Sequence, residues 1–74
     1  MAWWYFSFAD EDGFLGGVYA EGEPDLAAYA ALGLMGLNPG GECQWIGPLP
    51  DDEMDRQVPS ENRWRLLTKE EVLA

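Results

Sequence analysis

The residue types of this short chain leave packing as the main way to stabilise a fold. Its 74 residues can form one domain, and a domain of this size buries only about 60% of the surface that the unfolded chain exposes. The sequence has one cysteine, Cys43, and no histidine, so it lacks an intramolecular disulfide and the usual thiolate and imidazole ligands of transition metals. We therefore expect no metal and no cofactor. Aromatic packing or self-association into a homo-oligomer, a dimer or larger, should stabilise the fold.

Charge is distributed unevenly along the sequence. Residues 1–55 contain eleven Asp or Glu residues and no Lys or Arg, and all four basic residues follow. The net charge of −10 disfavours direct binding to nucleic acid or to an anionic membrane. The acidic surface either keeps an aromatic-rich chain dispersed or faces a basic partner, and both interpretations stay open.

The N-terminal residues do not have the pattern of a signal peptide. They carry no positive charge, and polar residues at Ser7 and Asp10 interrupt the apolar run. No segment approaches the roughly 20 apolar residues that span a bilayer. Because a free cysteine also suits a reducing compartment, we predict a cytoplasmic protein.

The first twenty residues predict a β-hairpin. Residues 2–9 are dense in aromatic side chains and short enough for one strand. Residues 14–20 form the return strand after an acidic turn that ends in Gly13. In the return strand, Gly16 and Gly17 indicate a β-bulge or, alternatively, the close approach of another backbone or a ligand.

Alternation gives the first strand two different faces. Trp4, Phe6 and Phe8 share one face, which we expect to lie in the core. Trp3 and Tyr5 lie on the other face, which is amphipathic. We predict this second face to be a contact surface.

A helix and a third strand follow the hairpin. Pro24, with carboxylates around it, indicates the start of a helix over residues 24–35, and Gly36 indicates its end. This helix has no charged residue after Asp25, so we expect it to be covered on more than one side. Residues 42–47 predict the third strand.

The last third of the chain changes in composition. Residues 48–59 are rich in proline and acids and are predicted to form an extended or mobile surface loop. Residues 60–74 are predicted to form a C-terminal tail. In this tail Thr68 and Glu71 have the spacing of a capping box, which predicts a short helix that begins near Lys69.

These elements predict a single α+β domain over residues 1–74, with the order β-β-α-β and a short C-terminal helix. A right-handed crossover would place the third strand parallel to the second and beside the first. The helix would then cover one face of a three-stranded sheet. The opposite face would be open or covered by a second copy of the chain.

The residue types also argue against an enzyme. Without histidine, the chain has no common general base for neutral pH and no Ser-His or Cys-His pair. Its two main carboxylate groups, at residues 10–12 and 51–53, are expected to be solvated rather than sheltered in a cleft. We therefore predict a non-enzymatic protein.

Two segments could together bind a small ligand. The turn with Asn38, Gly40 and Gly41 could form an anion-binding nest of backbone N–H groups, although a plain helix-to-strand turn has the same pattern. Arg63, Trp64 and Arg65 combine positive charge with an aromatic plane, which suits a nucleotide-type molecule. Alternatively, the two arginines pair with the chain's own carboxylates and the tryptophan packs in the core.

Four segments that span most of the chain carry a resemblance to a known group of proteins: Trp3–Ala9, Phe14–Gly17, Leu37–Glu42 and Arg65–Glu71. In the order of these segments the chain resembles small accessory proteins of unassigned function from actinobacterial phages. The resemblance implies a context and no catalytic or binding residues. Such proteins often inhibit a host enzyme or weaken a host defence system.

Three functions follow, in this order of preference. The first is an inhibitor that covers a functional site on a host or anti-phage defence protein. Its predicted contacts are the aromatic and acidic residues Trp3, Tyr5, Asp10, Glu11, Asp12, Asp51, Asp52 and Glu53. The second is an oligomer that sequesters a nucleotide-type immune signal through Asn38, Gly40, Gly41, Arg63, Trp64 and Arg65. The third is a structural or assembly role.

Overall fold

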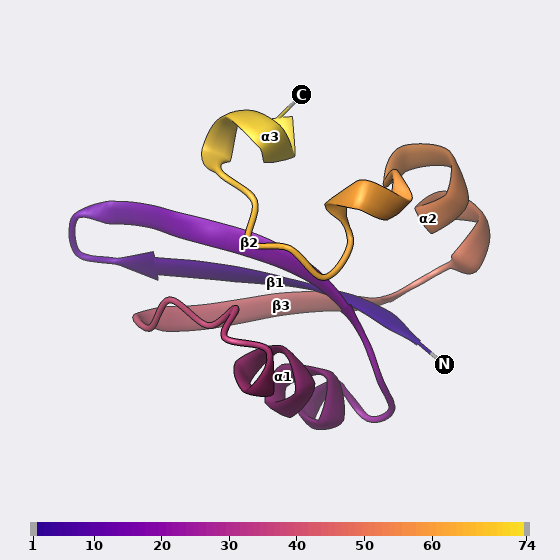
Figure 1. Ribbon diagram of the computed structural model, residues 1–74, viewed down its shortest axis with the longest axis horizontal. Helices are drawn as coiled ribbons and strands as arrows, with labels where there is room; N and C mark the ends of the chain where they lie inside the picture. Colours follow the sequence, from indigo (N-terminus) through magenta and orange to yellow (C-terminus); the bar gives the residue numbers. More distant parts are fainter. Residues whose placement is uncertain (1, 74) are drawn as a thin grey trace.

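A computed structural model of the chain describes residues 2–73. They form a three-stranded antiparallel sheet with one helix packed on it and short helices after the third strand, which confirms the α+β prediction (Figure 1). The elements are β1 (Trp3–Asp10), β2 (Gly13–Glu21), α1 (Asp25–Leu34), β3 (Glu42–Leu49), α2 (Asp51–Gln57), the 3-10 helix η1 (Ser60–Asn62) and α3 (Lys69–Leu73). Across these residues, no helix has the length and apolar character needed to cross a membrane.

The sheet has the strand arrangement that the sequence predicts. The order is β2-β1-β3, and both outer strands are antiparallel to β1, so β2 and β3 run parallel to each other. Phe6 of β1 lies opposite Val18 of β2 and Trp45 of β3. This register places the aromatic face of β1 at the centre of the sheet.

The core lies between this aromatic face and α1. Phe6 and Phe8 are fully buried with Val18, and from α1 Ala28 and Leu32 are buried against them. The predicted core face of β1 is therefore confirmed. Small alanine side chains let the helix approach the sheet closely.

α1 begins and ends where the sequence signals predict. Pro24 is its N-cap and Met35 its C-cap. Gly36 then adopts a positive φ of 75°, and the N–H of Leu37 donates to the carbonyl of Leu32 at 3.0 Å. This pattern is a Schellman motif, which explains why a glycine stops the helix here.

The glycine pair in β2 is explained by both of the predicted alternatives. Phe8 pairs with Gly16 but Ala9 pairs with Phe14, so one extra residue bulges out of β2. A β-carbon on Gly16 would lie 2.5 Å from the Leu66 side chain and 3.2 Å from the Leu67 backbone carbonyl oxygen, and one on Gly17 would overlap the Tyr5 ring. The glycines therefore allow a bulge and two close approaches.

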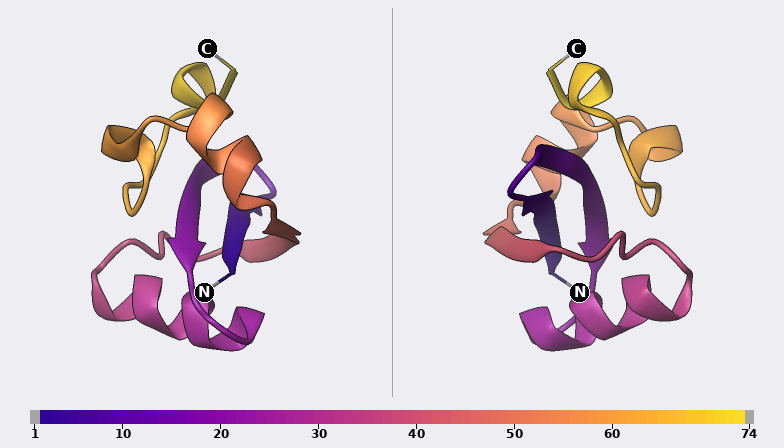
Figure 2. Two further views of the ribbon diagram at one scale, coloured as in Figure 1. Left: turned by 90° about the vertical axis from the view of Figure 1, so that its right-hand side faces the viewer. Right: turned by 90° about the vertical axis from the view of Figure 1, so that its left-hand side faces the viewer.

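The face of the sheet opposite α1 is covered by the chain itself, which corrects two predictions. Residues 48–59 contain the end of β3 and the helix α2, rather than a mobile loop. Met54 and Val58, one helical turn apart, are only 2% and 6% exposed. The expectation of a face that is open or covered by a second copy is therefore wrong, because α2, η1 and α3 lie over it (Figures 1 and 2).

The C-terminal segment Arg63–Leu67, here called the covering segment, lies along the outer edge of β2. Gly17 and Leu67 exchange two backbone hydrogen bonds, at 3.0 and 2.7 Å. The N–H of Trp64 donates to the carbonyl of Tyr19 at 2.9 Å. Leu67 is 2% exposed. The polar backbone groups on this edge of the sheet are therefore partly paired.

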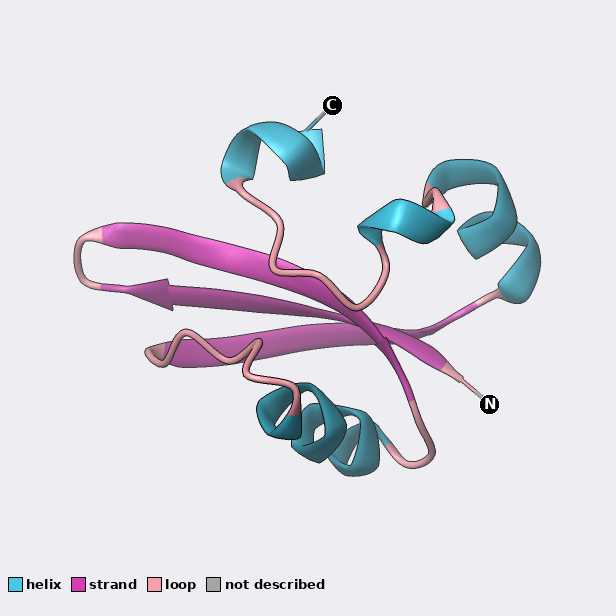
Figure 3. Cartoon of the chain, viewed as in Figure 1, coloured by secondary structure: helices cyan, strands magenta, loops and turns pink. Residues whose placement is uncertain are grey.

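The capping box that follows the covering segment is confirmed. The N–H of Thr68 donates to the Glu71 carboxylate at 3.0 Å, and the N–H of Glu71 donates to the Thr68 hydroxyl at 3.3 Å. α3 begins at Lys69, as predicted. Figure 3 shows this helix and η1 on the same side of the sheet as α2.

Candidate functional site

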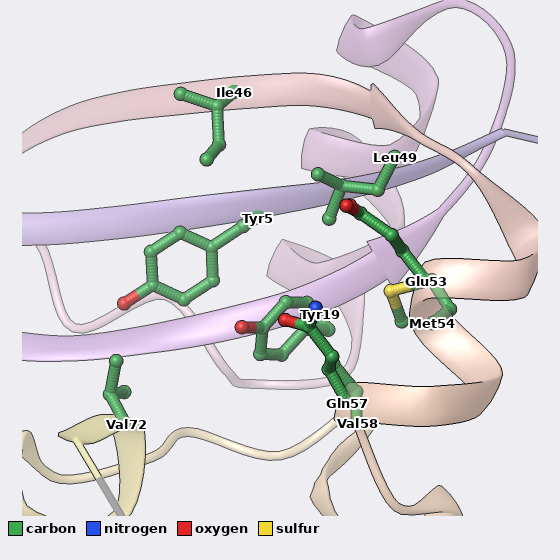
Figure 4. A pocket seen from close by; sticks show the side chains of 9 residues that line it. All are labelled: Tyr5, Tyr19, Ile46, Leu49, Glu53, Met54, Gln57, Val58 and Val72. Carbon is green, nitrogen blue, oxygen red and sulfur yellow. The ribbon is translucent and has the colours of Figure 1, made fainter.

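A pocket of about 300 Å³ lies between the sheet and the helices that cover its second face (Figure 4). All three strands contribute to it, and α2 and α3 form its sides. Its lining residues are mostly apolar: Tyr5, Tyr19, Ile46, Leu49, Glu53, Met54, Gln57, Val58 and Val72. It therefore has the composition of a binding pocket, with a few polar groups among apolar walls.

Two tyrosines from neighbouring strands form the floor of the pocket. Tyr5 of β1 pairs directly with Tyr19 of β2, and their ring centroids are 4.8 Å apart. Gly17, which has no side chain, leaves room for the Tyr5 ring. The aromatic floor is therefore fixed by strand register.

Burial gives these phenols a defined protonation state. Two effects raise the pKa of Tyr5 above its ordinary value: the larger is desolvation by burial, and the smaller is the electrostatic interaction with Tyr19. Desolvation also raises the pKa of Tyr19. Both groups therefore stay protonated at neutral pH and present hydroxyls that can donate or accept a hydrogen bond.

The side of the pocket nearest β3 is exposed to solvent. Ile46, on β3, is 62% exposed, and Leu49 at the end of the strand is half-buried. Glu53, in the first turn of α2, adds a carboxylate to the lining. A ligand that enters here meets an apolar wall and one negative charge.

The predicted acidic contacts are found at the two ends of β3. Asp51 and Asp52 lie with Glu53 in the first turn of α2, directly after the strand. Asp10 and Glu11 line a hollow together with Glu42, the first residue of β3. Asp12 lies in the same hairpin turn, which the Asp10 carboxylate closes by accepting a hydrogen bond from the Asp12 N–H at 2.8 Å.

Trp3 differs from the other predicted contacts because it packs within the chain. Its ring centroid lies 6.3 Å from that of Trp64, and the Arg63 guanidinium carbon lies 5.1 Å from the Trp3 ring. Trp3 is half-buried in this cluster. Of the two aromatic residues predicted for the second face, Tyr5 is therefore the one that lines the pocket.

The structure does not bring together the two segments of the predicted nucleotide site. Asn38, Gly40 and Gly41 lie in the loop after α1, where the Asn38 side chain donates to Tyr29 and accepts from the Gly40 N–H. Arg63, Trp64 and Arg65 belong to the covering segment at β2. This loop lies on the α1 side of the sheet, whereas the covering segment runs along the outer edge of β2 and bonds to α2 through Arg63 (Figures 1 and 2).

The two arginines of that predicted site bind groups of their own chain. Arg63 donates to the carbonyls of Met54 and Val58 at 2.8 to 3.1 Å and lies 3.5 Å from an Asp55 oxygen. Arg65 pairs with Glu71. Trp64 packs against the core cluster. The alternative of internal pairing and core packing therefore describes these residues.

The structure also bears on metal binding and on the reactivity of the single thiol. Among the residues described, no group of three or more Cys, Asp or Glu side chains is placed to hold a metal ion. Burial raises the pKa of the Cys43 thiol, so the thiolate form is disfavoured.

Most of the pocket residues were not predicted from the sequence. Met54, Gln57 and Val58 lie in a segment predicted to be a loop, and Ile46 and Leu49 were assigned no role. One signal was present, because Met54 and Val58 are apolar residues four positions apart in an acidic stretch.

Comparison of the chain with protein-family models, with curated proteins and with solved structures finds no significant match. The resemblance to phage accessory proteins therefore stays a prediction.

Proposed function

We propose that this chain is a non-enzymatic accessory protein that inhibits a host or anti-phage defence protein by binding to it. One observation carries the proposal: a pocket with an aromatic floor lies beside exposed apolar residues of β3, and carboxylates stand at both ends of that strand. Apolar groups surrounded by charge are typical of a surface that binds another protein.

The chemistry of the surface supports a basic partner. Glu53 belongs to the pocket itself, and Asp51 and Asp52 stand beside it in the first turn of α2. No Lys or Arg precedes residue 56. The field at this surface therefore attracts positively charged groups and speeds their encounter with the chain.

Affinity capture from an actinobacterial lysate, followed by light scattering of the complex, tests the proposal. We expect capture to weaken as salt rises, because screening acts on exposed charges. Neutralising Asp51, Asp52 and Glu53 to their amides should weaken it further. Circular dichroism should accompany this variant, because the three acids also stabilise the first turn of α2.

A variant with Glu61→Gln and Glu70→Gln serves as the control, since it removes negative charge from η1 and α3 and leaves the first turn of α2 unchanged. Salt-independent capture, with an affinity unchanged by the neutralisation of residues 51–53, would contradict the proposal. Turnover of a substrate by the purified chain would contradict its non-enzymatic part. Light scattering of the free chain also tests the predicted homo-oligomer.

A further inference from the structure

The two outer strands of the sheet have different surroundings. The covering segment pairs with the outer edge of β2. Within residues 2–73, no backbone group pairs with the outer edge of β3. Alternate residues of an edge strand direct N–H and C=O groups away from the sheet, so β3 presents a template for another strand.

The regular part of this template is short. Glu42–Ile46 pair with β1 in steady register, and the register then shifts between Ile46 and Leu49. Gly47 and Pro48 lie in the shifted part, and proline has no N–H to donate. An added strand can therefore pair along Glu42–Ile46 before the irregularity ends the ladder.

The side chains of β3 differ between its two faces. Trp45 lies on the side of α1, where its indole N–H donates to the Asp25 carboxylate at 2.6 Å. Ile46 lies on the other side and forms the pocket wall nearest the free edge (Figure 4). Neighbouring strands lie about 4.8 Å apart, so a side chain of an added strand would stand beside Ile46 and the pocket.

Charge favours a basic occupant over a second copy of this chain. Residues 43–49 carry no charge, and carboxylates flank them at Glu42 and at Asp51–Glu53. Pairing of two copies along β3 would bring together chains that each carry a net charge of −10, and neither β3 has a Lys or Arg to place near the carboxylates of the other. An extended segment with Lys or Arg at its ends would instead meet opposite charge.

We propose that β3 binds an extended, basic segment of a partner protein as a fourth strand, and that one long side chain of this segment enters the pocket. An aliphatic stem would pack between Ile46 and Leu49, and an ammonium or guanidinium head would approach Glu53. Backbone pairing would provide affinity, and the pocket would select the side chain. This inference rests on the proposed protein-binding function and specifies its mode.

The test begins with a displayed library of random peptides of about twelve residues, long enough to form a strand along Glu42–Ile46. The strongest binder is synthesised in three forms: unmodified, N-methylated at its odd amides, and N-methylated at its even amides. Only one set of amides in a strand faces its neighbour. We expect one methylated form to bind about 10-fold more weakly and the other within about 2-fold of the unmodified peptide.

Two variants, each with its own control, locate the binding site on the chain. Ile46→Lys should weaken binding at least about 10-fold, because it sets a like charge beside the incoming segment. The matched control is Leu34→Lys, at a residue of α1 that is 91% exposed, and it should leave affinity unchanged. Glu53→Gln should weaken binding about 2- to 5-fold, as expected for an exposed ion pair, and Glu61→Gln should not.

The outcomes separate this inference from the proposed function. Equal effects of both methylation patterns, or full binding by Ile46→Lys, would overturn the strand-pairing mode and leave protein binding intact. Enriched peptides without Lys or Arg would overturn the basic occupant. A dimer of the free chain that Ile46→Lys dissociates would show that β3 pairs with a second copy. Failure to enrich any peptide, with no captured lysate protein, would remove both proposals.

Discussion

The two edges of the sheet show how differently one small chain treats equivalent backbone groups. At the β2 edge, the covering segment pairs with Gly17 and Tyr19, and Leu67 is buried there. At the β3 edge, residues 43–49 are uncharged and Ile46 is exposed. Within residues 2–73 the outer edge of β3 has no backbone partner, and an uncharged edge of this kind can aggregate. The β2 edge is therefore part of the stable fold, and the β3 edge is the one to which the proposed partner strand would add.

The largest expected effect compares one apolar residue from each edge. Leu67→Ala should lower the free energy of unfolding by about 3 kcal/mol, because it leaves a cavity under the covering segment. Ile46→Ala should cost less than about 1 kcal/mol, because Ile46 is mostly exposed. Urea denaturation followed by tryptophan fluorescence measures both. Equal losses would mean that the two edges contribute alike to stability.

A smaller effect tests the close approach of the covering segment to β2. Gly16 and Gly13 both have positive φ, at 154° and 127°. A β-carbon on Gly16 would also meet Leu66, whereas one on Gly13 would meet no atom within 4 Å. Gly13→Ala should therefore cost about 1 kcal/mol from backbone strain alone, and Gly16→Ala about 2 to 3 kcal/mol.

Thermal and urea unfolding of these two glycine variants, side by side, isolates the steric part of the cost. If Gly13→Ala proves as destabilising as Gly16→Ala, backbone strain explains both and the packing of Leu66 on β2 contributes nothing.

The smallest effect concerns pH and the end of the covering segment. The hydrogen bond from the Thr68 N–H, and then that from Arg65, lower the pKa of Glu71 in the folded chain. The stabilisation of the folded chain by the ionised Glu71 is therefore complete above the ordinary glutamate pKa of about 4.3. It is lost as pH falls through the lower pKa that Glu71 has in the folded chain. After correction for the pH dependence of intrinsic exchange, the protection of the Gly17 and Leu67 amides should fall in that acidic range.

Glu71→Gln removes the titrating group, so the protection of its Gly17 and Leu67 amides should change less over the same acidic range. Thr68→Ala serves as a second control, because it removes the hydroxyl of the capping box and keeps the carboxylate. If Glu71→Gln loses protection at Gly17 and Leu67 at low pH as the unmodified chain does, another titrating group causes the loss.

Local signals made much of the fold predictable from sequence. The alternation of Phe6 and Phe8 in β1 fixed the core face, and the spacing of Thr68 and Glu71 fixed the start of α3. The crossover rule gave the strand order. For the core face and the start of α3 the deciding residues are near neighbours in the chain, so periodicity or a short motif contains the information, and the strand order follows from a general topological rule.

The missed helix shows where such signals conflict. Proline followed by acids marks both a loop and the start of a helix, and Pro50 acts as the N-cap of α2 as Pro24 does for α1. α2 contains one apolar residue, Met54, and Val58 follows as its C-cap, so little in the sequence shows which side of the helix is buried. A tertiary contact with the sheet decides between the two interpretations, and seven residues give too short a pattern to reveal it.

The pocket was less predictable than the fold for a related reason. Tyr5 was predicted as a contact and Glu53 as an acidic contact, but the position that unites them depends on five elements. The predicted nucleotide site shows the reverse: its residues have suitable chemistry, but Gly41 lies in the loop after α1, and Arg65 lies in the covering segment, where it pairs with Glu71. Residue types show what chemistry a side chain can perform. Whether distant side chains meet in one site depends on how the strands and helices pack, which the sequence pattern does not show.

The pairing of Gly17 with Leu67 also has a kinetic consequence. These two residues lie fifty positions apart in sequence, so their contact closes one of the longest loops in the chain and carries a large entropic cost. The hairpin of β1 and β2 joins near neighbours and can form first. We therefore expect the hairpin to form before the C-terminal residues dock on β2, and we expect substitutions at Leu67 to change the unfolding rate more than the folding rate.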